Sequence, residues 1–194
     1  MGEYEFVGKI TDDTDRWAID GTVFTYKGEM YFCWSGWLGE RNVEQRIYIA
    51  KMSSPTEISS RRVCISVPTY KWERQGGRPK VNEGPAIVTD GEYLAIVYSA
   101  SGSWCDDYCL GQLTFKGEDV LSANSWKKHS EPILKTDENR FYGPGHCSFV
   151  NDEKGNLWIA FHANLESGTG WDGRSGWMYP VRINGNGIVE ILFY

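Results

Sequence analysis

Three polar residues recur at one spacing along the chain, and their side chains could do acid–base chemistry together. Asp20, Glu83 and His146 are each separated from the next by 63 residues. Two carboxylates that face one pocket suit glycoside hydrolysis, because one must be protonated to give its proton to the leaving oxygen. A neighbouring negative charge raises the pKa of that acid. The spacing therefore predicts Glu83 as the general acid and Asp20 as the charge that tunes and orients it.

Each of these residues also has an ordinary structural interpretation. Asp20 stands in an Asp-Gly-Thr sequence and could bond its own backbone in a turn. A lone histidine such as His146 is commonly a satisfied structural group, as we interpret His129 and His162. The shared spacing favours a pocket role for His146, where it could hold a hydrated metal ion or hydrogen-bond a carboxylate.

The elements that must position these residues are short strands in a repeat of about 60 residues. The runs are rich in β-branched and aromatic residues and are bounded by turn residues, and no segment has a sustained helical period. Four strands per repeat is typical of a β-propeller blade. Because the first strand of each blade lines the central channel, the three polar residues would converge there. A three-sheet arrangement that is not a propeller is the alternative.

Dividing the chain by this repeat predicts an all-β partial propeller of about three blades, whereas closed rings usually have four to eight. The predicted blades occupy residues 17–80, 81–142 and 143–194, and residues 131–135 supply a strand of the middle blade. Residues 1–16 would end a preceding blade, with residues 4–10 as its outer strand. Uncovered apolar faces at both ends predict a homo-oligomer or further N-terminal blades as partners.

Composition agrees with this fold and narrows the partners. Aromatic residues make up 14%, and 22 glycines stand against 7 prolines, which favours strands and turns. No run of eighteen apolar residues exists, so no membrane span is expected. The net charge is -6 without a basic cluster, which argues against a nucleic-acid partner.

Cysteines and the start of the chain bear on the compartment. An odd count of 5 cysteines cannot form a complete disulfide framework, although Cys105 and Cys109 could close a tight loop. The opening Met1-Gly-Glu-Tyr-Glu-Phe lacks the basic start and apolar stretch of a signal peptide. A secreted or periplasmic location is left open.

Four motifs stand in order along the chain: Trp17-Ala-Ile-Asp-Gly-Thr-Val-Phe, Val81-Asn-Glu-Gly-Pro-Ala, Tyr98-Ser-Ala-Ser-Gly-Ser-Trp and Tyr142-Gly-Pro-Gly-His-Cys-Ser-Phe. Together they resemble glycoside hydrolase family 43, and more narrowly its α-L-arabinofuranosidase branch. The resemblance implies a five-bladed propeller and an inverting mechanism. It also implies removal of arabinofuranosyl or xylosyl units from arabinan, arabinoxylan or xylan oligosaccharides.

The resemblance assigns roles to individual residues. Glu83 matches the general acid, Asp20 the carboxylate that modulates its pKa, and His146 the pocket histidine associated with a bound metal, often calcium, or with water. Arg174, in a Trp-Asp-Gly-Arg sequence, matches a late arginine that reaches the pocket. The family's general base is an aspartate at the start of the first blade. No aspartate precedes Asp20 in that context, so we expect the base to be missing with about 120 residues of a roughly 315-residue ring.

Three tryptophans are candidates for stacking on sugar. Trp17, Trp37 and Trp104 stand where strands meet loops, and core packing is an equal alternative for them. Two other functions compete with the hydrolase. One is a non-catalytic carbohydrate-binding or remnant protein that keeps the pocket but lacks the base, and the other is a protein-binding propeller segment.

Overall fold

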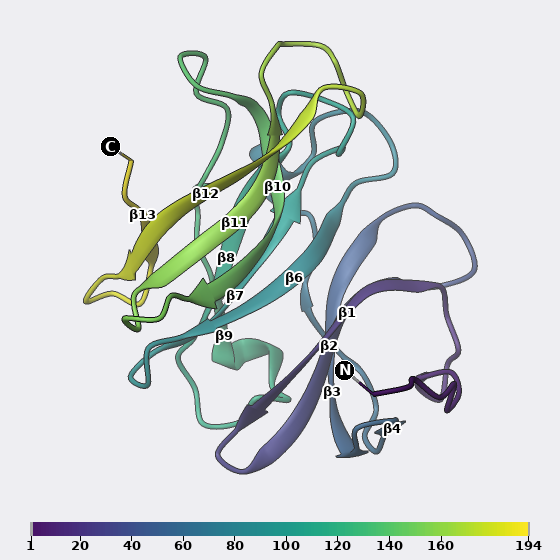
Figure 1. The fold of residues 1–194 in the computed structure, drawn as a ribbon. Helices are drawn as coiled ribbons and strands as arrows, with labels where there is room; N and C mark the ends of the chain where they lie inside the picture. The colour runs from purple at the N-terminus through teal and green to yellow at the C-terminus, as the bar shows by residue number, and fades with distance from the viewer. Residues whose placement is uncertain (1, 194) are drawn as a thin grey trace.

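The computed structural model describes residues 2–193, and its regular structure is almost entirely β-strand (Figure 1). Two short 3-10 turns, η1 (Lys71–Glu73) and η2 (Ala123–Ser125), are the helical elements among these residues. None of the described residues forms a helix long and apolar enough to cross a membrane. The strands are β1 (Ala18–Tyr26), β2 (Glu29–Trp37), β3 (Gln45–Ser54), β4 (Glu57–Ile58), β5 (Val63–Ser66), β6 (Asn82–Thr89), β7 (Leu94–Ala100), β8 (Cys109–Phe115), β9 (Trp126–Lys128), β10 (Tyr142–Asn151), β11 (Leu157–Asn164), β12 (Arg174–Ile183) and β13 (Val189–Ile191).

The strands form three antiparallel sheets that follow one another along the chain. The first has the order β1-β2-β3-β4 with β5 also paired to β3, the second β6-β7-β8-β9, and the third β10-β11-β12-β13. The first strands lie together at the centre, because β6 contacts both β1 and β10 (Figure 1). Successive antiparallel sheets with adjoining first strands are the blades of a β-propeller. The predicted all-β propeller fold, with about three blades in this chain, is confirmed.

The two interfaces between sheets are filled by apolar side chains. One cluster joins the first and second sheets and includes Ile47, Ile49 and Ile96. Another joins the second and third and includes Leu110 and Ile159. Every residue of β7 and β8 is buried, since the second sheet is covered on both faces. Burial on both faces explains why β7 is a nearly continuous apolar run in the sequence.

Sheet boundaries and the predicted segments differ in detail. Strands of the three sheets span residues 18–66, 82–128 and 142–191, and the division of the chain at residues 16, 80 and 142 stays a prediction. The strand predicted at residues 131–135 is not formed. The outer strand of this sheet is β9, which pairs with Leu113 to Phe115 of β8, and Leu134 makes only an isolated bridge to Leu110. All five cysteines are free, so Cys105 and Cys109 form no disulfide.

The segment before β1 lies against the outer face of the first sheet instead of forming a strand. Residues 4–10 contain no strand, which corrects the prediction of an outer strand there. A single extended segment is not stable as a strand unless it joins a sheet, and residues 4–10 pair with none of the described strands. The Asp12 carboxylate instead pairs with Arg62, Oδ2 to Nε at 3.4 Å, and both side chains are buried. Arg62 also stacks on the Tyr48 ring, at 4.3 Å from its centroid.

Candidate active site

A β-bulge interrupts the first strand of every sheet at the same place. The pairing register shifts between Ile19 and Thr22 in β1, and the same shift recurs near the starts of β6 and β10. The residue in each bulge has a left-handed backbone: φ is 57° at Asp20, 55° at Gly84 and 52° at His146. Bulges commonly re-aim a side chain beside a functional site. Here they turn Asp20 and His146 toward the junction of the three sheets.

The bulges correct the predicted repeat register by one residue. Asp20 and His146 are structural equivalents, but their counterpart in the second sheet is Gly84 and not Glu83. Glu83 pairs with Ser99, in the position that Ile19 holds in the first sheet. A constant 63-residue spacing could not reveal this offset, because Glu83 and Gly84 are consecutive and each is followed by small residues.

The structure nevertheless brings the three predicted residues together. The Asp20 carboxylate accepts a hydrogen bond from the Gly84 backbone N–H, with a distance of 2.9 Å to Oδ2. Its other oxygen lies 3.8 Å from Nε2 of His146. The His146 ring covers Gly84 so closely that a Cβ there would be 3.2 Å from Nδ1. Glycine at position 84 is therefore favoured both by the positive φ and by the imidazole above it.

Glu83 has the environment of a protonated acid. The side chain is buried, with 9% of the residue exposed, and Oε1 accepts a hydrogen bond of 2.7 Å from the Tyr108 hydroxyl. Burial raises the pKa of Glu83, and the Asp20 charge adds to the rise, while the Tyr108 hydrogen bond, His146 and Arg174 oppose it. The net pKa is above the ordinary value. The largest cause is burial, whereas the sequence had emphasised the Asp20 charge.

Two residues of this cluster escaped the sequence analysis. Tyr108 is buried and stacks on His162, with ring centroids 5.8 Å apart, and the His162 ring lies 6.4 Å from that of His146. Burial lowers the pKa of His162 to about 4, with smaller contributions from Arg174 and His146, so its imidazole is neutral near pH 7. His162 is thus part of the site and not merely structural. In the structure His162 pairs with Gly145, next to His146. The β-bulge shifts the pairing register there, so this pairing could not be counted from the sequence.

Arg174 lies where the resemblance suggested, at the start of β12. Its guanidinium donates a hydrogen bond of 2.8 Å to the backbone oxygen of Ser103. The positive charge lowers the pKa of both Glu83 and His162, which places it beside the carboxylate cluster. The loop that carries Ser103 and the loop before Arg174 therefore meet next to the site.

The predicted tryptophans divide into two places. Trp17 and Trp37 stack on each other with centroids 4.7 Å apart, and Trp17 also lines a cavity with Phe32 on the outer face of the first sheet. Trp104 meets Trp171 edge to face at 6.4 Å. Trp171 was not a candidate in the sequence analysis. In the structure, 62% of its surface is exposed. Its indole N–H donates to the Ser103 hydroxyl at 3.1 Å, in the loop that also binds Arg174.

A calcium ion at His146 stays a prediction from the resemblance. Among residues 2–193, no group of three or more His, Cys, Asp or Glu side chains is arranged to hold a metal ion. The Asp20 carboxylate is the acidic partner of His146.

Comparison with known proteins identifies the class to which this fold and site belong. The sequence matches Glycosyl hydrolases family 43 over residues 1–189, and the chain belongs to that family. An extracellular exo-alpha-(1->5)-L-arabinofuranosidase of Streptomyces avermitilis is 38% identical over 156 residues, which are 79% of this chain and 32% of that protein. Alpha-L-arabinofuranosidase 43 of Humicola insolens is 34% identical over 151 residues, which are 76% of this chain and 31% of that protein.

Solved structures agree with this assignment. The alpha-L-arabinofuranosidase from Lactobacillus brevis superimposes with a TM-score of 0.85 and 28% identity, over 95% of this chain and 58% of that one. A thermostable family-43 glycoside hydrolase does so with a TM-score of 0.76 and 25% identity, over 90% of this chain and 57% of the other. The chain thus spans about a third of the two curated relatives and somewhat more than half of these two structures.

Proposed function

We propose that this chain supplies the acid side of a glycosidase active site that releases arabinofuranosyl units from arabinan or arabinoxylan, with xylosyl units as the alternative substrate. Glu83 carries the proposal, because burial raises the pKa of its carboxyl and so favours the protonated form that can deliver a proton to a glycosidic oxygen. The names of the curated relatives support arabinose as the sugar.

Each neighbouring group has a defined part in this proposal. The Asp20 carboxylate accepts the Gly84 N–H, and its charge favours the protonated form of Glu83. Tyr108 holds Oε1 of Glu83 in place, so that the other oxygen can present the proton. Arg174 and His146 provide positive or donor groups for sugar hydroxyls beside the acid. Trp104, and also Trp171, provide ring faces for stacking on sugar at the loops that carry Ser103 and Arg174.

Inversion needs a second carboxylate that activates water, 6.5–9.5 Å from the acid in typical enzymes. Among residues 2–193, the one carboxylate that shifts the pKa of Glu83 is Asp20, which is already engaged by Gly84. Asp12 pairs with Arg62, and Asp15 with Lys9. We therefore propose that the base comes from further blades, which would also cover exposed apolar side chains such as Val150 and Met178 on the third sheet.

Hydrolysis of nitrophenyl arabinofuranoside and nitrophenyl xyloside tests this function, on the chain alone and on a form extended by the N-terminal blades of a relative. We expect turnover of the arabinoside in the extended form, inversion of the product's anomeric configuration by NMR, and loss of both in Glu83→Gln. Light scattering shows whether the chain alone associates with a second copy. Sugar binding without turnover in either form would contradict the proposal and support the carbohydrate-binding alternative.

A further inference from the structure

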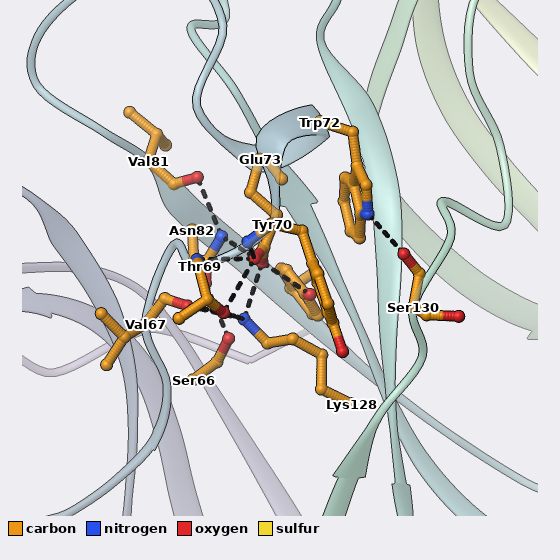
Figure 2. Close-up of polar contacts among 12 residues, drawn as sticks. Ser66, Val67, Thr69, Tyr70, Trp72, Glu73, Val81, Asn82, Lys128 and Ser130 are labelled. Carbon is orange, nitrogen blue, oxygen red and sulfur yellow. Dashed lines mark hydrogen bonds and ion pairs between the residues drawn. The ribbon is translucent and has the colours of Figure 1, made fainter.

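A charged residue lies buried behind the strand that carries Glu83. Glu73, in η1, is 0% exposed. The side chains and amides that hold its carboxylate come from three strands of the second sheet and from the loop before that sheet (Figure 2). The backbone N–H groups of Thr69 and Tyr70 each donate to Oε2 at 2.8 Å. On the other side, the Tyr98 hydroxyl donates to Oε1 at 2.9 Å.

Lys128 completes the charge balance of this buried group. Its Nζ lies 2.7 Å from Oε1 of Glu73 and donates as well to the Val67 backbone oxygen at 2.7 Å. Burial opposes ionisation of Glu73, but Lys128 and the amides of Tyr70 and Thr69 outweigh it and hold the pKa of Glu73 below its ordinary value. A buried ion pair of this kind adds little stability compared with well-packed apolar residues. Stability alone therefore does not explain why it is here.

Asn82 connects this network to the candidate acid. It is 0% exposed and directly precedes Glu83 in β6. Its amide Nδ2 donates to Oε1 of Glu73 at 3.1 Å, and its Oδ1 accepts from the Ser66 hydroxyl at 2.7 Å. Its backbone oxygen accepts from the Ser35 hydroxyl at 2.9 Å. The residue before Glu83 is thus fixed at its side-chain amide and at its carbonyl.

Strand geometry explains why a contact behind the sheet affects the front. Neighbouring residues of a strand point to opposite faces, so Asn82 faces the Glu73 network while Glu83 faces the site. The partner strand β7 repeats the arrangement: Tyr98 binds Glu73, and the next residue, Ser99, accepts the His146 backbone N–H at 2.7 Å. One carboxylate thus holds β6 and β7 from behind, through Asn82 and Tyr98.

We propose that Glu73 is a positioning residue for Glu83, acting through Asn82 and Tyr98 to fix where the acid side chain stands in the site. The proposal rests on the proposed function, in which Glu83 is the general acid. The largest charged contributions to the Glu83 pKa come from Asp20, His146 and Arg174. Asn82→Ala and Ser66→Ala change no charge, so a change of the Glu83 pKa in either variant reports geometry and not a direct electrostatic effect.

The test is an NMR titration of glutamate side-chain carboxyl carbons in the chain, with the Glu83 signal assigned by its loss in Glu83→Gln. In Glu73→Gln and in Asn82→Ala we expect the pKa of Glu83 to fall toward that of an ordinary glutamate, because a loosened β6 admits water to the buried carboxyl. The double variant should show no further fall, since both changes break one connection. The milder Ser66→Ala, which only removes the hydroxyl that supports Asn82, should give a smaller fall if Glu73→Gln does not fold.

Ile96→Val is the matched control, because it weakens the buried core of the same sheet without touching the network. Its Glu83 pKa should equal that of the wild type. An unchanged Glu83 pKa in Ser66→Ala and in every folded variant of Glu73 or Asn82 would overturn the inference. An ordinary Glu83 pKa in the wild type itself would instead overturn the proposed function.

A second readout applies to the extended, active form. Glu73→Gln should lower the rate on unactivated arabino-oligosaccharides about tenfold more than the rate on nitrophenyl arabinofuranoside, since only the former depends strongly on a well-placed acid. A smaller folded fraction would lower both rates equally and leave their ratio unchanged. Equal losses on both substrates would therefore contradict a positioning role.

Discussion

Gly145 offers the sharpest test of how the site is built. A methyl group at this position would place its carbon 2.0 Å from Cε1 and 2.4 Å from Cδ1 of Tyr108. Carbon atoms rest at about 3.5–4.0 Å from one another, so in Gly145→Ala the Tyr108 ring must move by about 1.5 Å. Tyr108 is only 1% exposed and has no free space to enter. Overpacking of this kind costs about 1–3 kcal/mol.

The expected effect on melting follows from the chain length. One kcal/mol shifts Tm by about 2–4 °C in a domain of this size, so Gly145→Ala should melt about 2–12 °C below the wild type. Gly176→Ala is the matched control. Gly176 stands in the same row of the third sheet, across His162, and a Cβ there has nothing within 4 Å. That variant should be stabilised by roughly 0.5 kcal/mol, as expected for removing a strand glycine.

The same variant should also change the acid. Displacement of Tyr108 removes the hydrogen bond that lowers the pKa of Glu83, so the pKa should rise further. Calorimetry and carboxyl NMR titration measure the two effects independently. Equal melting temperatures for Gly145→Ala and Gly176→Ala would refute the close approach of Tyr108 to β10. A lower Glu83 pKa in Gly145→Ala would refute the described hydrogen bond.

Three further predictions follow from the described site. Glu83→Gln should have a higher Tm than the wild type at pH 7 and above. A group whose folded pKa is raised loses its stabilising contribution as the pH rises through that pKa, at about 1.4 kcal/mol per unit of pKa shift. Equal Tm values for the variant and the wild type from pH 5 to 8 would contradict a raised pKa. The free energy of unfolding should fall as the pH drops from about 6.5 toward 4, because His162 binds a proton at higher pH in the unfolded chain than in the folded one. Urea titrations of His162→Gln should lack the part of this fall that is due to His162. Trp171→Ala should weaken binding of arabinotriose about tenfold, by roughly the 1–1.5 kcal/mol of one aromatic contact, and leave binding of free arabinose unchanged in calorimetry; equal weakening of both would place Trp171 beside the first sugar.

The fold could be predicted from the sequence because strand and turn signals are local. The hairpins around Gly28, Gly91 and Gly155 set the repeat, and the repeat predicted that Asp20 and His146 meet. The strand predicted at residues 131–135 failed for a tertiary reason. Ile133 and Leu134 meet the edge of β8 only at Leu110, while β9 pairs with Leu113 to Phe115 further along that edge.

Other parts of the site depend on geometry that no single sequence displays. A bulge adds one residue to a strand without a compositional mark, so the offset between Glu83 and Gly84 could not be counted. Tyr108 stands in a loop like several other aromatics, and its contact with Glu83 of β6 joins residues 25 positions apart in the chain. The Glu73 network has the same character, because its partners are gathered by tertiary folding from both sides of the blade.

The recurring bulge also bears on how such a site can diversify. The same backbone kink in each first strand gives every one of the three sheets a position aimed at the shared junction, whatever residue it carries. Aspartate tolerates the left-handed conformation better than most residues, and glycine accepts it freely. At residues 20, 84 and 146 the kink holds an acid, no side chain and an imidazole. At residue 84 the His146 ring fills the space that a side chain would need, so substitution alone can change the chemistry at two of the three kinks.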